Sequence, residues 1–186
     1  LYGGQLDQDY TQVQSDFYKY DGSNWAFLSG AGIQDSFQNA SGPFAQPGER
    51  YLATGFFDKQ NSKFYYFGGK GKDVNGRVGN LNDLWLYDRG AWKWLSGSQE
   101  RNPRARYGIK YQSDSSSTPG GRQSAASWLD GNGDFWLMGG RGYDYDGNYG
   151  YLNDLWKFDG VFWTWMSGDS IVDQSGVYGL LNIADS

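Results

Sequence analysis

A block of acidic and aromatic residues occurs three times along this chain at nearly constant spacing. In each copy an aspartate opens the run, a second aspartate closes it, and a tryptophan follows four residues later. These tryptophans, Trp25, Trp92 and Trp163, lie 67 and 71 residues apart. One structural unit of about 70 residues is therefore repeated, and the chain must fold as an array of like units. The copies are Asp16-Phe17-Tyr18-Lys19-Tyr20-Asp21, Asp83-Leu84-Trp85-Leu86-Tyr87-Asp88 and Asp154-Leu155-Trp156-Lys157-Phe158-Asp159.

Each unit contains short runs of aromatic and β-branched residues bounded by Gly, Asn and Asp, which predicts strands rather than helices. A Pro-Gly-x-Arg sequence, at 47–50 and again at 119–122, opens the second and third units. We expect four antiparallel strands per unit. In these two units the first strand is predicted at 51–57 and 123–129, the second at 64–69 and 135–140, the third through the Asn-Asp-Leu-Trp block, and the fourth at 92–95 and 163–166. Residues 1–4 are the end of the same second strand in a truncated first copy.

A four-stranded sheet has two faces to cover, so neighbouring units are expected to stack through their aromatic side chains. Tryptophans recur at equivalent positions, which predicts that they form the packing between sheets. Stacked four-stranded sheets around an axis make a β-propeller. The tryptophans assigned to this core are Trp85, Trp92, Trp94, Trp136, Trp156, Trp163 and Trp165.

The same residues resemble a known family. A double glycine closes an aromatic strand at Gly68-Gly69 and Gly139-Gly140, and Tyr87-Asp88 followed by Trp92 completes the pattern of a kelch repeat. The resemblance runs from Leu1 to about Gly168 and implies an all-β, kelch-type β-propeller segment of about three four-stranded antiparallel blades. Two features depart from the family: the period exceeds the usual repeat of about 50 residues, and the first copy has Ser15 in place of Asn and Phe27 in place of the second Trp.

We expect a single partial propeller over 1–186, with a truncated blade at 1–30, complete blades at 47–97 and 119–168, and the start of a further connection at 169–186. Propellers generally have four to eight blades, so this count does not close a ring. Two explanations are open. The chain is an excerpt of a six- or seven-bladed protein, or it completes its ring, or builds a filament, with other copies of itself through a head-to-tail contact.

Composition limits the classes of partner and of catalytic or metal site that the chain can have. In 186 residues there are 16 Lys and Arg against 21 Asp and Glu, and a formal charge of −5 argues against nucleic acid as a partner. No run approaches the about 18 apolar residues of a membrane helix, so membrane insertion is not expected. Cysteine and histidine are both absent, which excludes disulfides, thiol nucleophiles and imidazole-based metal sites. No cofactor is expected, and the copper site implied by a resemblance to the galactose oxidase type of kelch propeller is excluded for this segment.

Antiparallel connectivity places the long loops on one face. They are predicted at 5–14, 70–80 and 141–150 between second and third strands, and at 31–46, 98–118 and 169–175 between units. Binding residues favour long loops on a rigid scaffold, and Arg and Tyr are enriched in contact surfaces. Arg50 and Arg122 recur at the start of the first strand, where they are either hydrogen-bonded to loop carbonyls or exposed to a ligand. The candidate partner-binding residues are Arg77, Arg101, Arg104, Arg106, Arg141, Tyr143, Tyr145, Arg50 and Arg122.

Two local motifs suggest ligands or modification. Asp144, Asp146 and Asn148 alternate around a glycine like the start of a calcium loop. The twelfth position of such a loop is Leu155 rather than the required Glu, so a plain Gly- and Asp-rich turn is the competing interpretation. Asn39, in Asn39-Ala40-Ser41, is an N-glycosylation acceptor if the protein is secreted from a eukaryotic cell.

Two functional classes remain. The first is a non-catalytic binding or assembly module that presents long loops on one face to a protein or glycan partner, including other copies of itself; this is what the kelch resemblance most often implies. The second is a sugar-binding or carbohydrate-active propeller domain of a larger secreted enzyme, although no catalytic pair of acids can be recognised from spacing. The abundance of Gly, Ser, Asn, Tyr and Trp favours an extracellular or cell-surface location.

Overall fold

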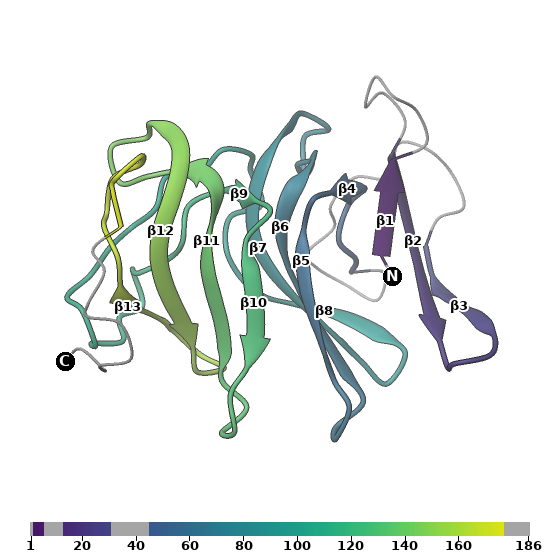
Figure 1. Ribbon diagram of the computed structural model, residues 1–186. Helices are drawn as coiled ribbons and strands as arrows, with labels where there is room; N and C mark the ends of the chain where they lie inside the picture. Colours follow the sequence, from purple (N-terminus) through teal and green to yellow (C-terminus); the bar gives the residue numbers. More distant parts are fainter. Residues whose placement is uncertain (1, 6–12, 31–44, 177–186) are drawn as a thin grey trace.

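The computed structural model describes residues 2–5, 13–30 and 45–176. These residues form three antiparallel β-sheets that stand side by side in chain order (Figure 1). They contain no helix, and hence none that could cross a membrane. The first sheet comprises β1 (Tyr2–Gln5), β2 (Val13–Tyr20) and β3 (Trp25–Ser29); the second β4 (Arg50–Tyr51), β5 (Thr54–Asp58), β6 (Lys63–Lys72), β7 (Val78–Asp88) and β8 (Ala91–Ser96); the third β9 (Arg122–Gln123), β10 (Ala126–Leu129), β11 (Phe135–Tyr143), β12 (Tyr149–Phe158) and β13 (Trp163–Ser167).

The first predicted strand of the second and third sheets is divided into two pieces. Both β4 and β5 pair with β6, and both β9 and β10 pair with β11. Between the pieces Leu52 and Ser124 have φ angles of 54° and 55°. Such left-handed conformations are uncommon for residues with a β-carbon. Because neither residue is a glycine, the sequence does not signal the break. Apart from this interruption, the predicted all-β character and antiparallel pairing are confirmed.

The second and third strands of each unit extend beyond the double glycine. Register shifts between Phe67 and Gly69, and between Met138 and Gly140, mark a β-bulge in each sheet. Pairing then continues to Lys72↔Val78 and to Tyr143↔Tyr149. The long loops predicted at 70–80 and 141–150 are therefore wrong: about half of each is strand, and only a short turn at 73–77 or 144–148 joins the two strands.

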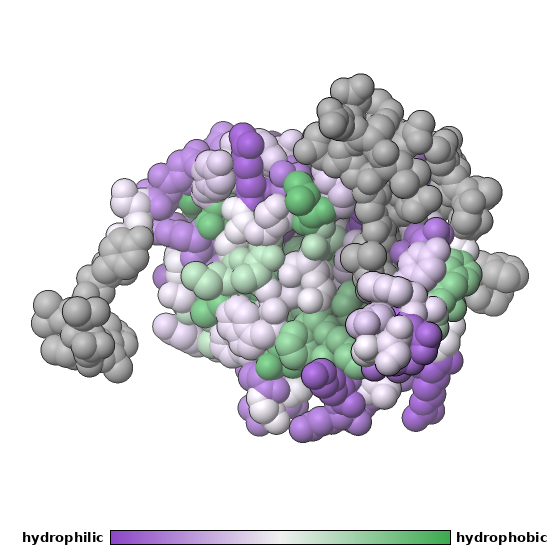
Figure 2. Space-filling model, turned by 45° about the vertical axis from the view of Figure 1, so that its right-hand side comes forward, coloured by the Kyte–Doolittle hydropathy of each residue, from purple (hydrophilic) through white to green (hydrophobic). Residues whose placement is uncertain are grey.

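The hydrophobic core lies between the sheets, in two layers. The layer between the first and second sheets contains Phe17, Tyr66, Trp85 and Trp92. The layer between the second and third sheets is formed by Phe67, Leu84, Phe135, Leu137, Trp156, Phe158 and Trp163. Hydrophilic residues gather at the two ends of the molecule in Figure 2, where the turns lie, with apolar and near-neutral residues between them.

Both layers repeat one interaction. The indole of Trp92 donates to Ser29 Oγ at 3.0 Å and its ring centroid lies 5.2 Å from that of Phe17, both in the preceding sheet. Trp163 donates to Ser96 Oγ at 3.1 Å and lies 5.6 Å from Phe67. Aromatic pairs at such distances contribute about 0.5–1.5 kcal/mol beyond their buried area. Each sheet therefore attaches to the previous one through the first tryptophan of its fourth strand.

The tryptophans predicted as core differ in their burial. Trp85, Trp92, Trp156 and Trp163 are buried. The side chains of Trp94, Trp136 and Trp165 are half-buried.

Candidate binding site on the long-loop face

A buried ion pair ties together the strands of each complete sheet. Arg50 binds Asp83 in the second sheet through two hydrogen bonds of 2.6 and 2.7 Å, and the Asp83 carboxylate also accepts the indole N–H of Trp85. In the third sheet Arg122 binds Asp154 at 2.5 and 2.8 Å, and Trp156 donates to the same carboxylate.

The same two guanidinium groups also donate to backbone carbonyls. Arg50 bonds the carbonyl oxygens of Gly48 and Gly68, and Arg122 bonds those of Gly120 and Gly139. Both arginine side chains are 0% exposed. The prediction that Arg50 and Arg122 contact a partner is therefore wrong, and the alternative of hydrogen bonding to carbonyls holds. Bidentate pairing satisfies the charges that burial would otherwise penalise.

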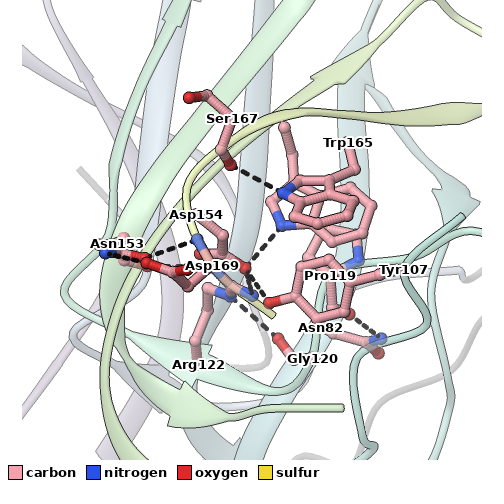
Figure 3. Close-up of polar contacts among 12 residues, drawn as sticks. Asn82, Tyr107, Pro119, Gly120, Arg122, Asn153, Asp154, Trp165, Ser167 and Asp169 are labelled. Atoms are coloured by element: carbon pink, nitrogen blue, oxygen red, sulfur yellow. Dashed lines mark hydrogen bonds and ion pairs between the residues drawn. The ribbon is translucent and has the colours of Figure 1, made fainter. Parts of the chain in front are cut away.

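The third sheet adds a tyrosine to its ion pair. The hydroxyl of Tyr107, in the connection between the second and third sheets, donates to Asp154 Oδ2 at 2.6 Å (Figure 3). Burial tends to raise the pKa of Asp154, but Arg122 and the other donors around the carboxylate hold that pKa below its ordinary value. Burial, reinforced by the Asp154 charge, raises the pKa of Tyr107. Asp154 therefore remains ionised and Tyr107 remains a neutral donor, which fixes this connection to the third sheet.

Asp73 and Asp144 occupy equivalent places in the turns after β6 and β11. Asp73 accepts the backbone N–H groups of Asn75 and Arg77 within its own turn and that of Arg101 at 3.2 Å from the following connection. Asp144 likewise accepts the N–H of Asn148 at 2.8 Å and that of Val172 at 3.1 Å. Burial opposes ionisation of Asp73, yet these donors lower its pKa. Each aspartate thus attaches a turn to the chain leaving the same sheet.

This role accounts for the motif that suggested calcium. Asp144 is fully buried and its oxygens accept turn and connection N–H groups, whereas Asp146 and Asn148 are exposed. Within the described ranges, no group of three or more His, Cys, Asp or Glu side chains could hold a metal ion. The geometry matches the competing interpretation, a Gly- and Asp-rich turn.

A polar pocket of about 740 Å³ opens on the long-loop face between the second and third sheets. Its wall includes Asn82 and Trp94 of the second sheet, the connection through Arg104, Arg106 and Ser115–Thr118, and the turn containing Tyr145 and Asp146. Asn82 holds the wall together: its side chain donates to the Pro119 carbonyl at 2.8 Å (Figure 3) and accepts the Ser98 N–H at 2.8 Å. The pocket is therefore built by the recurring asparagine and the long connection.

The pocket contains cationic groups that the protein does not neutralise. Arg104 and Arg106 are exposed, and neither guanidinium forms a hydrogen bond or ion pair within the part of the chain that the structure describes. A β-carbon on Gly147 would lie 2.5 Å from Arg104 Nε, so the absence of a side chain there lets the guanidinium lie against the turn. Asp146 supplies one negative charge to the lining.

Two buried polar atoms in the lining residues also lack partners. Ser117 Oγ and Trp94 Nε1 have no hydrogen bond to any described residue. A buried polar group left unpaired costs about 1–3 kcal/mol.

The structure brings three predicted partner-binding residues, Arg104, Arg106 and Tyr145, into the pocket. Arg77 instead forms an ion pair with Asp73 at 2.9 Å, and Arg101 donates to the Val78 carbonyl at 2.8 Å. The Arg141 guanidinium carbon lies 5.0 and 5.5 Å from the ring centroids of Tyr149 and Tyr151, and Tyr143 packs on Tyr149 at 5.2 Å. Asn39 lies outside the described residues.

Sequence reasoning did not identify Asn82, Trp94 or Ser117 as pocket residues. Asn82 carries a signal, because it recurs as Asn153, whose side chain accepts the Asp169 N–H at 2.9 Å just as Asn82 accepts that of Ser98. Ser117 lies in a serine-rich run, Ser113-Asp114-Ser115-Ser116-Ser117, whose contacts depend on the tertiary fold.

A second cavity, of about 790 Å³, lies between the first and second sheets. It is at the opposite face, called here the short-turn face, which carries the short turns such as 59–62 and 89–90. Its wall includes Phe17, Phe64 and Tyr87, whose rings pack against one another in the inter-sheet layer. We interpret it as the open end of that packing layer.

Comparisons with known proteins bear on the fold. No protein-family model matches the chain, and no curated protein matches it. The solved structure of YjhT is similar, with a TM-score of 0.52 and 18% sequence identity over 89% of this chain and 49% of that one. At this identity the likeness concerns the fold alone. The chain spans about half the length of the YjhT chain.

Proposed function

We propose that this chain is a non-catalytic binding module: a kelch-type propeller segment that presents its long-loop face to a glycan or protein partner carrying an anionic group. The repeated sheets, stacked through equivalent tryptophans, support the propeller architecture. The observation that carries the binding role is the pocket with two unpaired arginines, Arg104 and Arg106.

The distribution of carboxylates supports binding rather than catalysis. Asp83 and Asp154 are bound by buried arginines, and Asp73 and Asp144 accept backbone N–H groups. A general acid or base needs a titrating proton within reach of a substrate. These four buried groups are committed to the scaffold.

The pocket favours an anionic, hydroxyl-bearing ligand. Guanidinium groups bind carboxylate, sulfate and phosphate oxygens with paired N–H donors. The chain as a whole carries a formal charge of −5, so the two arginines form a local exception to an acidic protein. The serines and Tyr145 add hydroxyl groups that can exchange hydrogen bonds with a sugar or a peptide.

Calorimetric titration tests the proposal, with a uronate-containing disaccharide and a short glutamate-rich peptide as probes. We expect one of them to bind at low salt, and the double variant Arg104→Gln/Arg106→Gln to bind it at least about tenfold more weakly, a loss of about 1.4 kcal/mol. The matched control is Arg89→Gln, an exposed arginine on the short-turn face. Absence of binding to both probes, or equal affinity in the double variant, would overturn the proposal.

A further inference from the structure

The two outer sheets carry the two halves of the contact that joins the sheets inside the molecule. Inside, a tryptophan at the start of a fourth strand donates to a serine at the end of the preceding fourth strand, as Trp92 does to Ser29 and Trp163 does to Ser96. The next members of this series are Trp25 at one end and Ser167 at the other. Trp25 is 59% exposed and Ser167 is exposed. Neither Trp25 Nε1 nor Ser167 Oγ has a hydrogen-bond partner among the described residues.

The outward face of the third sheet is equivalent to the face of the second sheet that packs against the third. Met138 occupies the place of Phe67 and is 51% exposed, whereas Phe67 is 0% exposed. Leu155 occupies the place of Leu84 and is half-buried, whereas Leu84 is 0% exposed. Trp128 and Trp136 stack at 5.9 Å beside them. This tail face, comprising Trp128, Trp136, Met138, Leu155 and Ser167, is an inter-sheet surface on which the described residues place no neighbouring sheet.

The outward face of the first sheet is the opposite kind of surface. Tyr20 packs on Trp25 at 4.9 Å across the β2–β3 pair. Phe17 lies on the other face of β2 from Tyr20 and contacts Trp92 of the second sheet. Tyr20 and Phe27 are 52% and 55% exposed, although their equivalents Tyr87 and Trp94 are half-buried. This head face comprises Tyr20, Trp25 and Phe27, of which Tyr20 and Trp25 also reach the edge of the cavity between the first and second sheets. It matches the side of each sheet that attaches to the sheet before it.

We infer that the tail face binds the head face of a second copy of this chain, with Trp25 of one copy donating to Ser167 of the other. The occupant is a second copy because the head face carries the tryptophan that each internal contact uses, at the same place in β3 as Trp92 in β8 and Trp163 in β13. The contact is heterologous, since different surfaces meet, and it leaves one head and one tail free in each dimer. This inference is independent of the long-loop pocket.

Sedimentation velocity of the full chain, over a hundredfold range of concentration up to about 100 µM, tests the inference. We expect the wild type to associate with concentration. Trp25→Ala removes a head anchor and Met138→Lys places a charge on the tail, so each should weaken self-association at least about tenfold. The matched control is Val161→Lys, which changes an apolar residue that is 67% exposed in a turn outside both faces. It should associate like the wild type.

Mixing the two variants distinguishes a head-to-tail contact from a symmetric one. Trp25→Ala retains an intact tail and Met138→Lys retains an intact head, so an equimolar mixture should form a one-to-one complex that neither variant forms alone. Circular dichroism and thermal unfolding show that each variant is folded. A wild type that stays monomeric throughout, an undiminished association of either folded variant, or no complex in the mixture would each overturn the inference.

Discussion

The second and third sheets contain equivalent residues in equivalent strands. The faces that the two sheets turn away from the first sheet nevertheless differ sharply in burial. Leu84 and Phe67 of the second sheet are sealed by the third sheet, whereas Leu155 and Met138 of the third sheet have no such neighbour among the described residues. The internal ion pairs, in contrast, are the same in both sheets. The comparison separates two sources of stability: polar networks that each sheet builds for itself, and apolar layers that require a second sheet.

The largest effect should come from the networks, and it should be similar in the two sheets. Asp154→Ala and Asp83→Ala each leave a buried guanidinium without its partner, which costs about 3–5 kcal/mol of unfolding free energy. Urea denaturation followed by tryptophan fluorescence measures the loss. A cost well under 1 kcal/mol in either sheet would contradict the idea that each sheet depends on its own ion pair.

Truncation of the equivalent leucines should separate the sheets. Leu84→Ala removes side-chain atoms from a closed layer and should cost about 2–5 kcal/mol. Leu155→Ala, on the half-open face, should cost about 1 kcal/mol or less because solvent already reaches that face. The same urea experiment, run at low protein concentration to keep the chain unassociated, compares the two variants. Equal losses would show that the tail face is covered.

A further difference between the second and third sheets, among the described residues, is the Tyr107 hydroxyl on the ion pair of the third. Tyr107→Phe removes a hydrogen bond to a charged carboxylate and should cost about 1.5–3 kcal/mol at neutral pH. Because the pKa of Asp154 is lowered in the folded protein, its contribution to stability is present above the ordinary value of 3.8 and is lost as the pH falls below it. Without the Tyr107 donor the folded pKa rises, so less of the stability depends on pH.

Unfolding free energies measured between about pH 2 and 7 should therefore vary less steeply with pH, below the ordinary aspartate value of 3.8, in Tyr107→Phe than in the wild type. Tyr111→Phe is the matched control, because Tyr111 is 72% exposed. An unchanged pH dependence in Tyr107→Phe would show that this hydroxyl does not hold the carboxylate in its charged form.

The strands were predictable because their periodicity is local, whereas the contacts that use distant residues were not. The aromatic runs and their Gly, Asn and Asp boundaries predict β8 and β13 to within one residue at each end, and β6 and β11 as far as the double glycine. The break at Leu52 and Ser124 carries no glycine, so nothing in the local sequence announces the positive φ angles. The interpretation of the three sheets as blades of a propeller stays a prediction.

The sequence carries a signal for the burial of Arg50 and Arg122. Arg50 precedes Asp83 by 33 residues and Arg122 precedes Asp154 by 32. This near-constant separation indicates that the same Arg–Asp pair forms within each repeat. Arg104 and Arg106, in contrast, have no equivalents in the other units at a fixed offset. Their place in a pocket depends on the path of the connection, which only the three-dimensional structure defines.

The attachment of Tyr107 to Asp154 gives the connection a thermodynamic role. Arg106 is the residue before Tyr107, so the arginines reach their positions only while the tyrosine is anchored on a folded third sheet. A ligand that binds the proposed pocket only in the folded state would therefore also stabilise the third sheet against unfolding. Heat or acid that breaks the hydrogen bond between Tyr107 and Asp154 should release such a ligand in the same transition.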